Sequence, residues 1–144
     1  MFKKLFKNER GLTLIELLAV VVILGIIAAI AIPAIGGMIS NSKKDAHIAN
    51  AEQIANAARI YIATNNSDVK AGDVTITLDT LITDGHLEEI KNPSGTEYGE
   101  GSQVRASNEE GKVKFYVTLV EGDETYIDGS EEVKEIDREN VSNV

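Results

Sequence analysis

A single carboxylate stands at the start of an otherwise apolar stretch. Residues 17–32 read Leu-Leu-Ala-Val-Val-Val-Ile-Leu-Gly-Ile-Ile-Ala-Ala-Ile-Ala-Ile, which suits the interior of a bilayer, and Glu16 immediately precedes them. A charge in such a segment is costly, and it generally marks a function that involves a partner of opposite sign. We expect that partner to be a new positive charge, an α-amino group made by cutting the chain just upstream.

Charge is distributed unevenly along the 144 residues. The chain has a net charge of −9, whereas residues 1–11 carry a net +3 from Lys3, Lys4, Lys7 and Arg10 against Glu9, which leaves −12 for the remainder. The basic start predicts retention on the cytoplasmic side of a membrane. The acidic remainder argues against direct binding of nucleic acid. The length allows one membrane segment and one small domain, and the absence of cysteine excludes a disulfide.

Two simpler interpretations of the N-terminus stay open. The first is an ordinary secretory signal, which requires a small-residue cleavage site after the apolar run, and Ala28, Ala29 and Ala31 supply small residues. The second is a plain membrane anchor, which accounts for the apolar run and its basic flank. Neither interpretation explains why Glu16 is present.

Residues 11–16 read Gly-Leu-Thr-Leu-Ile-Glu. This segment resembles the class III signal of type IV pilins and pseudopilins, in which a short basic leader ends in Gly before an apolar residue, Thr, two apolar residues and Glu. Leu12 stands where Phe is commoner in that family, and Pro33 falls where many of its members have a kinking proline. The resemblance implies that a prepilin peptidase cleaves after Gly11 and that the new first residue, Leu12, is N-methylated.

The resemblance further implies a structural protein with no catalytic activity and no cofactor. The chain would be a major-pilin-like subunit of a homopolymeric type IV filament, single-pass in the cytoplasmic membrane before assembly and extracellular afterwards. Its partners would be other copies of itself, the prepilin peptidase and the inner-membrane assembly platform. The alternative is a pseudopilin of a type II secretion system or of a competence (DNA-uptake) pilus.

The spacing between Leu12 and Glu16 agrees with an ionic role. Cleavage after Gly11 creates an α-amino group whose ordinary pKa is about 8, so it is cationic at neutral pH, and N-methylation retains the charge. Glu16 follows Leu12 by four residues, about one helical turn. In a stack of parallel helices the Glu16 of one subunit can pair with the Leu12 amine of another and set their register. Pairing within one chain is the alternative that spacing leaves open.

Few helix breakers occur between Leu12 and Thr64, so we expect one long helix with an apolar part at 12–39 and an amphipathic part at 40–65. Its second part carries an apolar stripe made of Ile48, Ala51, Ala55, Ala58 and Ile62. Pro33 removes a backbone donor and predicts a kink. By the resemblance, the stretch from Gly25 to Pro33 can unwind inside a filament.

Residues 40–144 are predicted to form the globular domain of an α+β pilin fold, with the long helix packed on a small antiparallel sheet. A short helix near 78–84 ends at Gly85, and Asp73–Leu78 alternates as an extended segment does. Strands are expected near 103–107, 112–120 and 124–128. The strongest alternation places Val113, Phe115, Val117 and Leu119 on one face, which should pack against the stripe of the helix.

Other possible sites carry little weight. His47 and His86 are the only histidines and have no spacing typical of a metal site, so no metal is expected. Acidic residues crowd 121–132 and suggest a solvated edge, with calcium binding as the alternative. Two N-glycosylation triplets occur, Asn65-Asn66-Ser67 and Asn140-Val141-Ser142. The tail after Gly129 is acidic and weakly patterned, although Val133 and Ile136 hint at a final short element.

Overall fold

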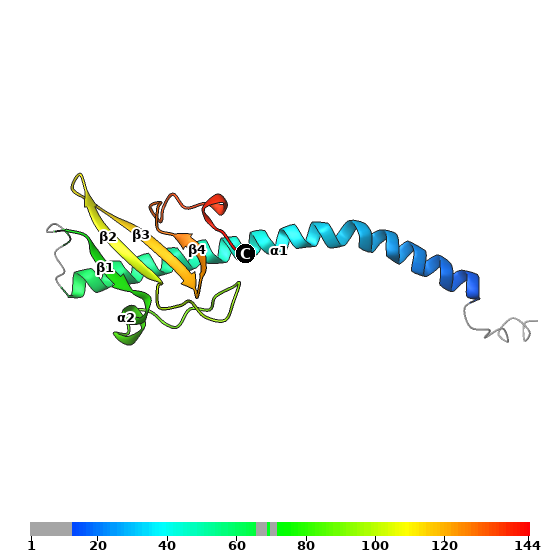
Figure 1. The fold of residues 1–144 in the computed structure, drawn as a ribbon, viewed down its shortest axis with the longest axis horizontal. Coiled ribbons are helices and arrows are strands. Elements are labelled where there is room, and N and C mark those ends of the chain that lie inside the picture. Colours follow the sequence, from blue (N-terminus) through cyan, green and yellow to red (C-terminus); the bar gives the residue numbers. More distant parts are fainter. Residues whose placement is uncertain (1–12, 66–68, 70–71) are drawn as a thin grey trace, which may run out of the picture. The chain divides into compact units, whose positions relative to one another are not determined.

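The computed structural model describes residues 13–65, 69 and 72–144. Helix α1 runs from Leu14 to Thr64, 51 residues with Pro33 inside, and it is shown from blue to green in Figure 1. The chain divides into two compact units, one ending at Ile39 and one comprising Ser40–Val144. Within the described residues, α1 alone is long and apolar enough to cross a membrane.

Four antiparallel strands form one sheet in the second unit. They are β1 (Val74–Thr77), β2 (Gln103–Glu109), β3 (Lys112–Glu121) and β4 (Glu124–Asp128), in the spatial order β1-β2-β3-β4. Helix α2 (Leu78–Thr83) follows β1 directly, and a short 3-10 helix, η3, spans Arg138–Asn140. Figure 1 shows the strands beside the part of α1 that belongs to this unit. The α+β fold with a long N-terminal helix on an antiparallel sheet is therefore confirmed.

The core lies between α1 and the sheet. The helix contributes a face of small side chains around one larger residue, Ile54, and the alanines let the helix approach the strands closely. The sheet contributes Val104 and Ala106 from β2 and three alternate residues of β3. The buried residues of this interface include Ala51, Ile54, Ala55, Ala57, Ala58, Ile76, Val104, Ala106, Phe115, Val117, Leu119 and Ile127.

The amphipathic patterns are confirmed with two corrections. Ala51, Ala55 and Ala58 are buried as expected, whereas Ile48 and Ile62 pack only partly against the core. Phe115, Val117 and Leu119 also face inward. The placement of Val113 was wrong, because it is 43% exposed. Val113 pairs with Asn108 close to the β2–β3 turn, so it lies beyond the buried part of the strand, which begins at Phe115.

The boundaries of the shorter elements agree with local signals. Thr77 caps α2 by accepting a hydrogen bond from the Thr80 backbone N–H (3.2 Å). Gly85 takes a φ of +76° immediately after the helix, which explains why glycine ends it. Helix α1 ends at Thr64, one residue before the bound of 65 expected for its amphipathic part, and Asn65 lies in the following turn.

The acidic tail is part of the fold. Val133, Ile136 and Val141 are buried, and the Val133 backbone N–H donates to the Phe115 carbonyl (2.8 Å). Farther on, the Ser142 N–H donates to the carbonyl of Tyr126 on β4 (3.0 Å). The tail therefore covers strand edges that would otherwise be free to pair with another chain.

Arg138 of η3 ties the tail to α1 through its guanidinium, which donates two hydrogen bonds to the Asp45 carboxylate, each at 2.6 Å. Lys44 adds a hydrogen bond to the Arg138 carbonyl (2.9 Å). With no cysteine in the chain, these contacts hold the tail where a disulfide cannot.

Candidate assembly site at the start of helix α1

Thr13 and Glu16 form a reciprocal cap at the start of α1. The Thr13 backbone N–H donates to Glu16 Oε2 at 2.7 Å, and the Thr13 hydroxyl donates to the same oxygen at 2.9 Å. In the other direction, the Glu16 N–H lies 3.4 Å from Thr13 Oγ1. This is the capping box, in which each side chain satisfies a backbone donor that the first helical turn leaves free.

The sequence contained a signal for this cap, because Thr-x-x-Glu before an apolar run is its usual pattern. An interpretation of Glu16 only as the ionic partner of the Leu12 amine does not account for this cap. The carboxylate therefore has a local role in starting the helix, besides any role between subunits. Oε2 accepts both hydrogen bonds, and Oε1 accepts none from the described residues.

The helix that follows is apolar on every side as far as Ile39. Glu16 is the only ionisable residue between Thr13 and Ile39. The large apolar side chains of this segment are exposed, from 47% for Val20 to 86% for Leu14. A surface of this kind is not stable in water, so this part of the chain requires lipid or other protein around it.

The remaining residues predicted for this site are only partly described. Gly11 and Leu12 lie outside the described residues, so cleavage and methylation there stay predictions. Gly25 and Pro33 both lie within α1, which is helical through both positions. A Cβ built at Gly25 would meet no atom within 4 Å, so packing inside the chain does not require glycine there. Unwinding of this stretch in a filament stays a prediction.

The N-terminal segment also matches a known family model. Residues 6–32 carry the prokaryotic N-terminal methylation motif. This motif is the class III signal peptide of type IV pilin-like proteins, and it supports a type IV pilin-like or pseudopilin subunit. Proteins with this motif are structural rather than enzymatic. No curated protein and no solved structure matches the chain.

The motif agrees with what the helix start shows. Type IV pilin-like precursors are anchored in a membrane, and α1 is apolar enough to serve as that anchor. The motif also implies processing by a prepilin peptidase and assembly into a filament. The motif extends only to residue 32. The interpretation of the globular domain therefore depends on its structure alone.

The acidic region 121–132 is occupied by internal hydrogen bonds rather than arranged around an ion. The Glu121 carboxylate accepts from the backbone and hydroxyl of Thr96 (3.2 and 3.0 Å), from Asn92 Nδ2 (2.7 Å) and from the Tyr126 hydroxyl (3.0 Å). The hydrogen bond from the Thr96 backbone is the main reason that the pKa of Glu121 is lowered. Asp128 accepts from Ser130. Across the described ranges, no group of three or more His, Asp or Glu side chains converges in a way that holds a metal ion.

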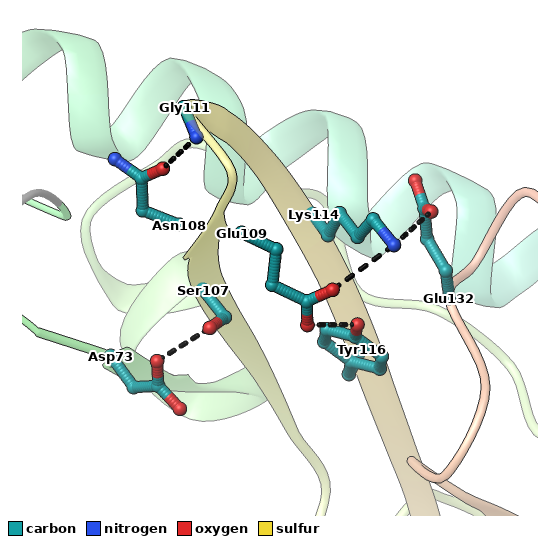
Figure 2. A network of polar contacts seen from close by, with 8 residues as sticks. All are labelled: Asp73, Ser107, Asn108, Glu109, Gly111, Lys114, Tyr116 and Glu132. Carbon is teal, nitrogen blue, oxygen red and sulfur yellow. Dashed lines mark hydrogen bonds and ion pairs between the residues drawn. The ribbon is translucent and has the colours of Figure 1, made fainter.

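A second polar network covers the outer face of the β2–β3 hairpin (Figure 2). Lys114 bridges the carboxylates of Glu109 (3.0 Å) and Glu132 (3.8 Å), and the Tyr116 hydroxyl donates to Glu109. The Asn108 side chain accepts from the Gly111 N–H and closes the turn (3.0 Å). These groups satisfy one another, so the network supports the hairpin and leaves no converging groups for catalysis.

An open cavity of about 550 Å³ lies beside α2, and it lacks a catalytic arrangement. Its walls combine apolar residues such as Ile82 and Ile90 with carboxylates such as Asp79 and Glu89. The buried hydroxyl in its lining, on Ser102, donates to the Val120 carbonyl and accepts from the Val120 N–H. That hydroxyl is used by the sheet, and no hydrogen bond within the described residues joins it to a base that could activate it as a nucleophile.

His47 is the polar residue whose importance the sequence did not reveal. Its side chain is fully buried, and its two ring nitrogens lie 2.8 Å from the Tyr98 hydroxyl and 2.9 Å from the Ser94 hydroxyl. The ring stacks on Tyr126 with 4.4 Å between centroids. These partners come from a loop and a strand far along the chain, so no local pattern indicated them.

Proposed function

We propose that this chain is the structural subunit of a type IV pilus-like filament and that it polymerises through residues 12–39. Residues 1–11 hold the precursor on the cytoplasmic side until a prepilin peptidase cuts after Gly11 and methylates Leu12. Residues 40–144 form the exterior domain. An inner-membrane platform then moves subunits from the membrane into a surface filament of identical copies.

The observation that carries this proposal is the position of Glu16. It is the only charge in the apolar part of α1, and it lies within a methylation motif. A carboxylate held among apolar helices is destabilised unless a cation compensates it. The cation that processing creates in every subunit is the amine of Leu12, one helical turn away.

The capping box leaves room for such a pair. Thr13 uses only Oε2 of Glu16, so Oε1 can accept a hydrogen bond from the N-methylated amine of a neighbouring subunit. The cap also restrains the carboxylate before the neighbour arrives, which lowers the entropy lost on pairing. Glu16 would thus start its own helix and fix the axial position of the next one.

The exposed apolar surface of α1 supports the same conclusion. Residues 14–39 present large apolar side chains around the whole helix, which suits lipid before assembly and neighbouring helices after it. Lipid tails are as apolar as these side chains, so burial alone does not favour one environment over the other. A charge pair between the Glu16 of one subunit and the Leu12 amine of the next would supply the needed preference.

Intact-mass analysis of the main protein in sheared surface filaments tests the proposal. We expect a mass that lacks residues 1–11 and carries one added methyl group, located on Leu12 by fragmentation. A mature protein that begins near Ala31 would instead restore the ordinary secretory signal. Electron microscopy of the same material shows filament length, which separates a long pilus from the short filament of a secretion or competence pseudopilin.

A further inference from the structure

His47 joins three parts of the exterior domain. It lies on α1, its ring nitrogens contact Ser94 and Tyr98 of the connection between α2 and β2, and its ring stacks on Tyr126 of β4. We call residues 91–98 the latch loop. Ser94 and Tyr98 lie at the two ends of the second half of this loop, so a single imidazole holds both ends of that segment against the helix.

The hydrogen bonds around His47 define which protonation state of its ring fits the site. Asn50 Nδ2 donates to the Tyr98 hydroxyl oxygen at 2.9 Å, so the hydrogen of that hydroxyl points to Nδ1 of His47. The other ring nitrogen, Nε2, therefore carries the proton and donates to Ser94 Oγ. Neutral His47 is fully satisfied, whereas a second proton on Nδ1 would face the Tyr98 hydroxyl hydrogen.

Among the residues that the structure describes, no group in contact with the ring compensates a charged imidazole. Lys43, one turn earlier on α1, has the same sign and together with burial lowers the pKa of His47 to about 4, with burial the larger cause. Tyr98 from the latch loop and Tyr126 from β4 stay neutral, since burial raises the pKa of both, that of Tyr98 to about 12. Asp45, two residues before His47 on α1, is paired with Arg138 of the tail.

Within the described part of the chain, Glu121 of β3 is the carboxylate hydrogen-bonded to this cluster, and it makes no hydrogen bond to the ring. It accepts hydrogen bonds from Asn92, Thr96 and Tyr126, and the one from the Thr96 backbone N–H is the main reason that its pKa is lowered. Because the pKa of Glu121 lies below its ordinary value of 4.5, this carboxylate is ionised at pH 5 and above. Between pH 7 and pH 5, His47 of the open loop is therefore the group in this cluster whose charge changes.

We propose that His47 is a proton-operated latch for residues 91–98. The neutral ring holds Ser94 and Tyr98 against α1. Protonation releases them and ends the edge contact between the Tyr98 and Tyr126 rings. The β-sheet does not depend on the contacts that are released, because its own ladder and the α1 interface remain. The exterior domain thus changes one surface loop with acidity while its core stays folded.

The thermodynamic linkage between protonation of His47 and opening of the latch loop gives the sign and the size of the pH effect. The closed loop lowers the pKa of His47, from an ordinary value near 6.5 for the open loop, so closure is favoured above pH 6.5 and is lost progressively toward pH 4. With these two values the open-to-closed ratio rises about 20-fold between pH 7 and pH 5. A change of that size is measurable even when the open state is rare at pH 7.

Residue-resolved hydrogen exchange of the full chain in detergent micelles tests the latch. The reporters are the backbone amides of Ser94, bonded to Asn92 Oδ1 (2.9 Å), and of Thr96, bonded to Glu121 Oε1 (3.2 Å). After correction for intrinsic rates, we expect about 20-fold less protection at these amides at pH 5 than at pH 7. The amide of Val117 in the core of β3 should keep its protection.

Two histidine variants form a matched pair. In His47→Gln the side chain cannot gain a proton, so protection at Ser94 and Thr96 should be the same at both pH values. His86, the other histidine, is half-buried against Tyr61, and His86→Gln should retain the 20-fold change. An equal change in His47→Gln, no change in the wild-type chain, or an equal loss of protection at Val117 would each overturn the latch.

A direct titration keeps the test decisive if His47→Gln does not fold. In His86→Gln, labelled histidine gives a single imidazole signal, which belongs to His47. We expect the pKa of that signal to lie well below the ordinary value of 6.5. The change in exchange at Ser94 should also be present in this variant. A signal that titrates near 6.5 would show an accessible ring and would overturn the proposal.

Discussion

Phe115→Ala is the change that most directly tests how the exterior domain is held together. Phe115 is 4% exposed, projects from β3 into the core and lies under the Arg59 guanidinium of α1, 4.7 Å from its ring centroid. Truncation leaves a cavity in the interface between helix and sheet, and buried Phe→Ala changes destabilise proteins by about 3–5 kcal/mol. Loss of the Arg59 contact adds to that.

The loss is large for a domain of this size. A domain near 100 residues shifts its melting temperature by about 4–8 °C for each kcal/mol, so the expected decrease is at least about 12 °C. The assay is thermal unfolding of residues 40–144 followed by circular dichroism, because every contact of Phe115 named here lies within that unit. We also expect this fragment to stay monomeric, because the polymerising segment is absent.

Val113→Ala supplies the matched control on the same strand. Val113 is 43% exposed, so its truncation removes few core contacts and should change the stability by about 1 kcal/mol or less. Comparable decreases for the two variants, or a Phe115→Ala domain that melts within a degree or two of the wild type, would refute the assignment of the inward face. Filaments formed by the fragment alone would place the polymerising surface outside residues 12–39.

Four further variants test three separate sets of contacts. Glu16→Gln keeps a side chain that can close the capping box but removes the charge, so it should give few filaments. Thr13→Ala breaks the cap and keeps the charge, so it should assemble better than Glu16→Gln. A wild-type filament yield from Glu16→Gln would contradict the ionic role. Gly95→Ala places a Cβ on the carboxylate of Glu121, so nuclear magnetic resonance should show displaced signals for the latch loop, and an unchanged spectrum would contradict this packing. Asp45→Asn removes an exposed ion pair that holds the tail, so the melting temperature should fall slightly at low salt and match the wild type near roughly 1 M salt.

The sequence alone determined the features that depend on neighbours along the chain. The methylation motif, the apolar helix and the isolated charge of Glu16 are all properties of one continuous stretch of the sequence. The same holds for α2, which Gly85 follows two residues after its end, and for the alternation along β3. Local periodicity and turn chemistry are sufficient for such features, so the α+β fold and most strand positions were predictable.

Other features could be read from the sequence only in part. Alternation predicted an inward Val113, but burial also depends on where along the strand the core begins, and β3 enters it only at Phe115. The capping box was visible as Thr13-x-x-Glu16, yet the geometry was needed to show that it uses a single carboxylate oxygen. In both cases the pattern identified the side chain, and the surrounding structure determined its environment.

Tertiary structure alone decided the features built from distant residues. His47 contacts Ser94 and Tyr98, which follow it by 47 and 51 positions, and Glu121 accepts hydrogen bonds from residues 25 and 29 positions earlier. A lone histidine and a crowded acidic segment have no periodicity that would indicate these partners. Their roles exist only because the packing of α1 on the sheet brings the latch loop, β3 and β4 together and excludes water. Burial then strengthens each hydrogen bond and makes an unpaired charge costly.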